Sequence, residues 1–153
     1  MDKFEWTPDL ELGIEVIDAQ HRRIVDYIND LTDAVDNENV ETVFDVMACL
    51  RDYTLDHFTF EEQLMEKAGY GLLKPHHLLH QRFEDKVIHM TDDLTSGSDP
   101  FSVAIRARHS LKTWLIQHIS HEDQDYVEVV TKALQKEQGW VAGALKKIFG
   151  SAV

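Results

Sequence analysis

Several histidines and carboxylates of this chain stand where amphipathic helices place their core residues. Apolar residues recur every three or four positions along four segments, and each segment carries a histidine on its apolar face. Burying a neutral polar group without a partner costs roughly 1–3 kcal/mol, and a carboxylate costs more. Seven such groups would cost on the order of 10 kcal/mol, comparable with the whole stability of a small domain. A metal centre would compensate these seven side chains, which are His21, His57, Glu61, His76, His80, His118 and Asp123.

The spacing of two pairs of these residues supports a shared site. His57 precedes Glu61 by four residues and His76 precedes His80 by four, so each pair shares one helix face. Both pairs lie at the helix ends nearest one predicted turn, and antiparallel packing brings such ends to the same level. No serine or cysteine arrangement for nucleophilic catalysis and no glycine-rich phosphate loop competes with this signal.

The other three candidates complete the cluster, with one geometric difficulty. His21 lies near the start of the first predicted helix and His118 well along the last, at the same level. Asp123 follows His118 by five residues, about 140° round an ideal helix, so it reaches the site only if the helix opens locally or the side chain extends across. Histidine-rich ligation without thiolates suits iron, zinc, copper or nickel. Seven ligands exceed one tetrahedral zinc ion and fit two octahedral ions with bridging carboxylates, a solvent oxygen and one open position.

Three nearby residues are weaker candidates for metal ligation. His77 points about 100° away from its neighbour on the apolar face, so we expect it to be solvated. Glu122 lies four residues after His118 and is the alternative to Asp123. We interpret Asp18 as a helix-start cap or as a hydrogen-bond partner of a ligand.

Four further residues are expected outside the site. We expect His89 and His109 at the surface or its boundary, and Glu62 on a solvated helix face. Cys49 is expected to be a small buried residue of the second helix.

Composition and charge exclude several classes of protein. A chain of 153 residues fits one domain. Its formal net charge of −13 argues against nucleic-acid binding, which requires a basic surface. One cysteine excludes an internal disulfide and suits a reducing cytoplasm. The sequence shows no secretory signal and no apolar run long enough to span a bilayer, so we expect a cytoplasmic protein. We also expect a monomer.

The helical periodicity predicts an all-α fold. We expect helices over about 15–36, 40–67, 75–94 and 100–130, with Asn39 and Asp99 as N-caps. Short connections between long helices predict an up-down-up-down antiparallel four-helix bundle over residues 1–130, entered by an irregular arm of about 14 residues.

The segment 131–153 differs in character from the predicted bundle. It carries four lysines and one glutamate, a local charge of 4 − 1 = +3. An apolar stripe at helical spacing predicts a short C-terminal helix. Such an amphipathic extension either packs on the acidic bundle or docks onto a protein or membrane surface.

The residues of the cluster also match a known family. The pattern His57-Phe58-x-x-Glu61-Glu62, His76-x-x-x-His80 and His118-Ile119-x-x-x-Asp123, preceded by His21, resembles the hemerythrins, most closely the bacterial ones. Trp6, the segment 13–18 and Gln20 extend this resemblance, which covers residues 4 to about 128.

The resemblance implies a cofactor and a role for each ligand. The cofactor would be two non-haem iron ions joined by an oxo or hydroxo bridge. In the family, the positions of His21 and His57 hold the iron that keeps an open position. Those of His76, His80 and His118 hold the other iron, and those of Glu61 and Asp123 bridge the two.

The function that the resemblance implies is reversible O2 binding, for storage, delivery or sensing, and not catalysis. Ile24 and Leu115, each one helical turn from a ligand, are the candidates for an apolar O2 pocket. The alternative is a di-iron enzyme acting on O2, peroxide or NO, which would need a proton donor beside the open position. The sequence offers no convincing acid there beyond the bridging residues.

Overall fold

The computed structural model describes residues 1–150, apart from the side chain of Glu122. The alternative ligand Glu122 and the last three residues of the predicted extension therefore lie outside the described part of the chain. Across residues 1–150, every helix is too short or too polar for a bilayer span.

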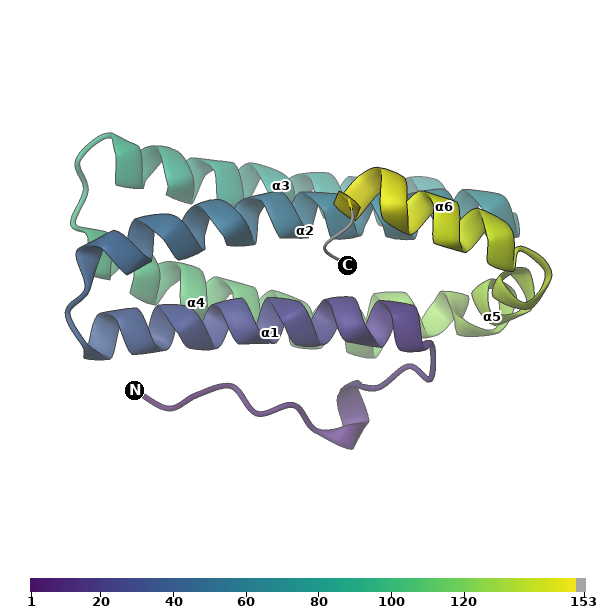
Figure 1. Cartoon of the computed structure of the whole chain (residues 1–153), viewed down its shortest axis with the longest axis horizontal. Helices are drawn as coiled ribbons and strands as arrows, with labels where there is room; N and C mark the ends of the chain where they lie inside the picture. Colours follow the sequence, from purple (N-terminus) through teal and green to yellow (C-terminus); the bar gives the residue numbers. More distant parts are fainter. Residues whose placement is uncertain (151–153) are drawn as a thin grey trace.

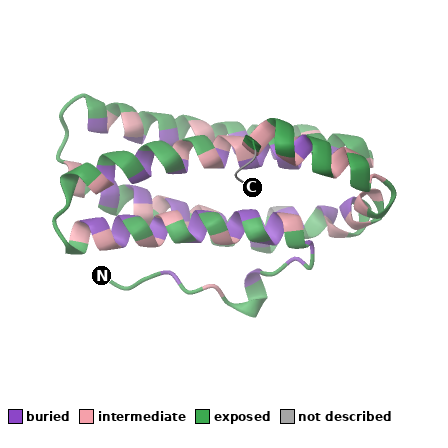
Figure 2. Ribbon diagram, viewed as in Figure 1, coloured by how far each residue is buried: buried purple, intermediate pink, exposed green. Residues whose placement is uncertain are grey.

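Four long helices form an antiparallel bundle, which confirms the predicted fold class (Figure 1). They are α1 (Glu15–Asp36), α2 (Val40–Ala68), α3 (Leu73–Thr95) and α4 (Pro100–Gln117). α1 packs against α2 and α4, and α3 packs against α2 and α4. The apolar faces meet along the bundle axis, where buried residues recur at helical spacing in every helix (Figure 2).

The ends of these helices follow from local side-chain chemistry. The Asn39 side chain accepts a hydrogen bond from the Thr42 backbone N–H (3.1 Å) and caps α2. Asp99 caps α4 through the Ser102 N–H (3.1 Å), as expected. Gly69 ends α2 with φ of +72°, a left-handed conformation that glycine adopts without a steric penalty.

The last predicted helix is not continuous. α4 ends at Gln117 and is followed by a π-helix, η2 (His118–Asp123), and a 3-10 turn, η3 (Gln124–Tyr126). α5 (Val127–Lys136) then resumes α-helical geometry. No proline or glycine marks this break, so composition gave no sign of it.

The N-terminal arm is tied to the outside of α1. The Phe4 N–H donates to Asn29 Oδ1 (2.7 Å), and Asn29 Nδ2 donates back to the Phe4 carbonyl (3.0 Å). The arm contains one short 3-10 turn, η1 (Pro8–Leu10), and buries Leu10, Leu12 and Ile14. Figure 1 shows the arm running beside α1.

The chain ends in α6 (Gln138–Phe149), which folds back along α2 (Figure 1). The Phe149 ring lies 5.3 Å from the Tyr53 ring and 6.2 Å from the Phe60 ring, measured between centroids. The apolar stripe of α6 packs against the core through Trp140, Val141, Ala144, Leu145 and Ile148.

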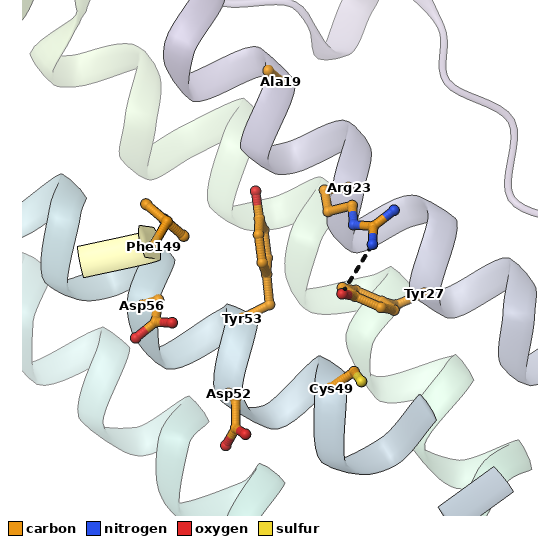
Figure 3. Close-up of a pocket in the computed structure, with 8 residues that line it drawn as sticks. All are labelled: Ala19, Arg23, Tyr27, Cys49, Asp52, Tyr53, Asp56 and Phe149. Atoms are coloured by element: carbon orange, nitrogen blue, oxygen red, sulfur yellow. Dashed lines mark hydrogen bonds between the residues drawn. The ribbon is translucent and has the colours of Figure 1, made fainter. Parts of the chain in front are cut away.

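A hollow of about 580 Å³ opens between α1 and α2 beside the end of α6 (Figure 3). Cys49 lines this hollow with Tyr27 and Tyr53 and is exposed. The expectation that Cys49 is buried was therefore wrong, because its position on α2 faces this opening and not the bundle axis.

The contact of α6 with α2 predicts a measurable stabilisation. Replacing Phe149 with alanine should lower the free energy of unfolding by about 1–2 kcal/mol, because a half-buried ring leaves its aromatic contacts. Urea denaturation followed by circular dichroism measures this change. The exposed Phe44 is the control, and its alanine variant should lose less than about 0.5 kcal/mol. Equal losses in the two variants would contradict the packing of α6.

Candidate metal centre

The seven candidate ligands converge inside one end of the bundle. All are at most 4% exposed. α1 supplies one histidine, α2 a histidine and a glutamate, α3 two histidines, and η2 the remaining two residues. The antiparallel packing of α2 and α3 brings their i, i+4 pairs together beside the turn that joins them. The seven residues are His21, His57, Glu61, His76, His80, His118 and Asp123.

Glu61 lies between two sets of imidazoles. Its Oε2 atom is 3.3 Å from His57 Nε2 and 4.0 Å from His21 Nε2. Its Oε1 atom faces the second set, at 2.8 Å from His76 Nε2 and 3.1 Å from His80 Nε2. The two oxygens of this carboxylate thus point to different groups of histidines.

The two carboxylate oxygens of Asp123 also face different histidines. Its Oδ2 atom lies 3.2 Å from His21 Nε2. Its Oδ1 atom lies 3.1 Å from His118 Nε2 and 3.4 Å from His76 Nε2. Two carboxylates therefore stand between the same two groups of imidazoles.

The π-helix explains how Asp123 reaches the cluster. A π-helix forms its hydrogen bonds between residues five apart, so its wider turn brings residue i+5 close to alignment with residue i. His118 and Asp123 are the first and last residues of η2 and are five apart. Two ways for Asp123 to reach the site were expected from the sequence, and the structure shows the first, a local opening of the helix.

Two groups of ligand atoms are compact enough to hold metal ions. One comprises His21, His57, Glu61 and His118, and the other Glu61, His76, His80 and His118. Within each group the ligand atoms lie within 4.8 Å of one another. Glu61 and His118 belong to both, so two ions would share one enclosed site.

Hydrogen bonds from surrounding residues fix the orientation of the candidate ligands. His57 Nδ1 donates to Gln20 Oε1 (2.7 Å), and His80 Nδ1 donates to Glu62 Oε2 (3.0 Å). Each bond leaves the Nε2 atom of its imidazole facing the cluster. The Tyr126 hydroxyl donates to Glu61 Oε2 (3.1 Å).

The roles of Glu62 and Tyr126 were not predicted from the sequence, and Gln20 entered only through the family resemblance. Glu62 was expected on a solvated face, but it is only 19% exposed and is bonded to His80. Glu62 follows Glu61 directly on α2, and a position adjacent to a ligand was the only sequence signal for its role. Tyr126 lies beyond the break at η2, where helical periodicity does not apply.

Aromatic rings from α2, α3 and α4 pack around two histidines of the cluster. Phe58 stacks on His80 with centroids 3.9 Å apart and planes 12° apart. Trp114 stacks on His118 at 4.5 Å and 16°, and on Phe83 at 4.0 Å. These contacts hold the imidazole planes and exclude solvent from them.

The electrostatics of the cluster separate its histidines. Burial lowers the pKa of His57 to about 4. Burial also disfavours a charge on His76, but the carboxylates of Asp123 and Glu61 beside it outweigh this effect and raise its pKa to about 9. Burial would raise the pKa of Glu61, but the imidazoles of His118 and His57 hold it well below its usual range. The carboxylates of Glu61 and Asp123 therefore stay ionised, and their charges favour the protonated form of His76.

Unsatisfied polar atoms show that these side chains fit a metal centre. Four residues of the cluster bury atoms that make no hydrogen bond within the described part of the chain. The atoms are His21 Nδ1 and Nε2, His57 Nε2, His80 Nε2, and Asp123 Oδ1 and Oδ2. Buried nitrogen and oxygen atoms without partners are costly, and a cation would compensate most of them.

The weaker candidates His77 and Asp18 lie apart from the cluster, as do His89 and His109. His77 is 48% exposed and contacts Glu62, and His89 and His109 are exposed at the surface. Asp18 is buried and accepts hydrogen bonds from the N–H groups of Leu12 (2.9 Å) and Gly13 (3.1 Å). Asp18 thus anchors the segment that enters α1.

Comparisons with known proteins identify relatives over most of this chain. A family model described as Hemerythrin HHE cation binding domain matches residues 12–130. A bacteriohemerythrin of Pseudomonas aeruginosa (strain LESB58) is 38% identical over 151 residues, covering 95% of this chain and 97% of the relative. A bacteriohemerythrin of Stenotrophomonas maltophilia (strain R551-3) is 36% identical over the same shares. None of these names denotes an enzyme.

A solved structure supports the fold independently. The crystal structure of a hemerythrin variant superposes on this chain with a TM-score of 0.74 at 23% identity. The superposition covers 85% of this chain and 98% of the other. The matched segment 12–130 contains all seven residues of the cluster. This chain therefore belongs to the hemerythrin family.

Proposed function

We propose that this chain binds two iron ions in the cluster and uses them to bind O2 reversibly, for oxygen storage, delivery or sensing in the cytoplasm. His21 and His57 would hold one ion. His76, His80 and His118 would hold the other, with Glu61 and Asp123 spanning both. The observation that carries this proposal is that both carboxylates turn one oxygen toward each group of histidines.

The choice of iron rests on the donor set and on the family. Five imidazoles and two carboxylates, without a thiolate, suit first-row transition metals. Membership of the hemerythrin family favours iron among these. Ferrous ions held by these residues would supply the electrons with which O2 is bound.

The surrounding residues would keep this binding reversible. Ile24 and Leu115 are fully buried, each three residues from a proposed ligand. Their apolar side chains would exclude water and protons from the open position, because an apolar shell controls solvent access to a metal site. Tyr126 would hold Glu61 in the orientation that spans both ions.

The buried polar groups near the cluster favour binding over turnover. A di-iron enzyme acting on O2, peroxide or NO would use a proton donor close to the open position. Asp18 is bonded to two backbone N–H groups, and the Tyr126 hydroxyl is bonded to Glu61. Both groups are therefore already engaged, and reversible binding is the function that the site supports best.

Reversible binding predicts a spectral cycle. Protein loaded with Fe(II) under argon should develop a visible absorption band in air and lose it under argon, over several cycles. Spectrophotometry measures the band, and an oxygen electrode measures uptake. Uptake of O2 that stops once a stoichiometric amount is bound supports reversible binding. Continuous consumption of O2 with a reductant would instead favour the enzyme.

The ligand assignment predicts the metal content of variants. Replacing His76 with alanine should reduce iron well below two ions per chain, because one ion loses a ligand. Elemental analysis of the folded variant measures this. The His109→Ala variant is the matched control, since His109 is exposed away from the cluster, and it should keep two ions. Two ions in His76→Ala would refute the assignment.

The protonation of His76 predicts a pH dependence of metal affinity. The pKa of His76 in the metal-free protein is raised to about 9, so below this pH the imidazole must lose a proton before it binds an ion. The apparent affinity for Fe(II) should therefore rise about tenfold per pH unit between pH 7 and 9. The pKa of His57, about 4, is too low to contribute in this range. Chelator competition under argon, corrected for the chelator's own protonation, measures the slope. A flat profile would contradict the assignment of His76.

A further inference from the structure

We propose that Glu62 and Gln20 are positioning residues that make the two halves of the metal centre electronically different. A charged carboxylate lies behind His80, and a neutral amide lies behind His57. The protein would thus donate more electron density to the ion held by His76, His80 and His118 than to the ion held by His21 and His57. This inference rests on the proposed binding of two ions.

The bond between Glu62 and His80 is well placed for this role. Glu62 Oε2 lies 3.0 Å from His80 Nδ1, on the opposite side of the ring from the Nε2 atom that faces Glu61. His80 is fully buried, and its ring is stacked on Phe58. The imidazole therefore has little freedom to turn away from either partner.

Glu62 is held in place by a second histidine. Its Oε1 atom contacts His77 Nδ1, so the carboxylate is fixed between an exposed and a buried imidazole. Both oxygens of Glu62 therefore accept bonds from imidazole nitrogens, and this arrangement stabilises the charged form of the carboxylate.

Gln20 occupies the corresponding place at the other half of the site. Its Oε1 atom accepts the bond from His57 Nδ1 (2.7 Å), and its side chain is buried. Its Nε2 atom has no hydrogen-bond partner among the described residues. Gln20 thus orients His57 as Glu62 orients His80, but it adds no charge.

The difference in charge has a known physical consequence. A carboxylate that accepts the outer N–H of a ligating histidine makes that imidazole a more basic donor, and a neutral amide does so less. A more basic donor stabilises the higher oxidation state of the ion relative to the lower one. Losing such a partner typically weakens metal affinity 10- to 100-fold.

Two reciprocal, nearly isosteric substitutions test the proposal. Glu62→Gln keeps a hydrogen-bond acceptor for His80 and removes only the charge, whereas Gln20→Glu adds a charge behind His57. We expect Glu62→Gln to make the reduction potential of the iron-loaded protein more positive and to weaken iron affinity about 10- to 100-fold. We expect Gln20→Glu to make the potential more negative.

The measurements separate electronic tuning from loss of structure. Spectroelectrochemistry under argon gives the potential, chelator competition gives the affinity, and circular dichroism reports folding. His109→Ala is the control, because His109 is exposed away from the cluster and its loss should leave the potential unchanged. Glu62→Asp should restore part of the affinity lost in Glu62→Gln.

The outcomes distinguish this inference from the proposed function. Unchanged potentials in both variants, or shifts in the same direction, would overturn the tuning role while two ions and reversible O2 binding in the parent protein stand. A parent protein that does not take up two ions would overturn the proposed function itself. If Glu62→Gln fails to fold, the direction of the shift in Gln20→Glu decides alone.

Discussion

The constraint on which this structure depends is the burial of two ionised carboxylates among five imidazoles inside a helical bundle. Mostly apolar side chains fill the rest of the interior, and the cluster is shielded from solvent. Contacts within the cluster satisfy part of them, since Glu61 and Asp123 each approach histidines from both sides. The atoms left without hydrogen bonds point to cations as the missing component. The bundle holds this arrangement because four of its elements supply ligands at one level.

Most of the candidate ligands lie on regular helices, and the others lie on one irregular segment. α1, α2 and α3 carry their ligands on regular helical faces, and neighbouring groups such as Gln20, Glu62 and Phe58 lock the imidazoles in orientation. The exception is η2, where a π-helix replaces regular geometry between His118 and Asp123. A π-helix is less stable than an α-helix and is found most often at functional sites. Here it lets two residues of one segment reach the same cluster.

Helical periodicity predicted the parts of the fold that repeat regularly. The bounds of α1 were predicted to the residue, and those of α2 to within one, because apolar spacing and caps such as Asn39 mark them. The break after Gln117 carries no such mark, since it results from packing around the cluster. Glu62 and Cys49 were misplaced for a related reason. Periodicity identifies the face toward the bundle axis, but not which outer positions a neighbouring helix covers.

The central claim is that iron ions neutralise the buried cluster, and anomalous diffraction tests it most directly. Crystals of freshly purified protein would be measured on both sides of the iron absorption edge. We expect two iron peaks, one between His21, His57 and the shared carboxylates, and one between His76, His80, His118 and the same carboxylates. A single zinc ion, or a folded chain with no metal at this position, would contradict it.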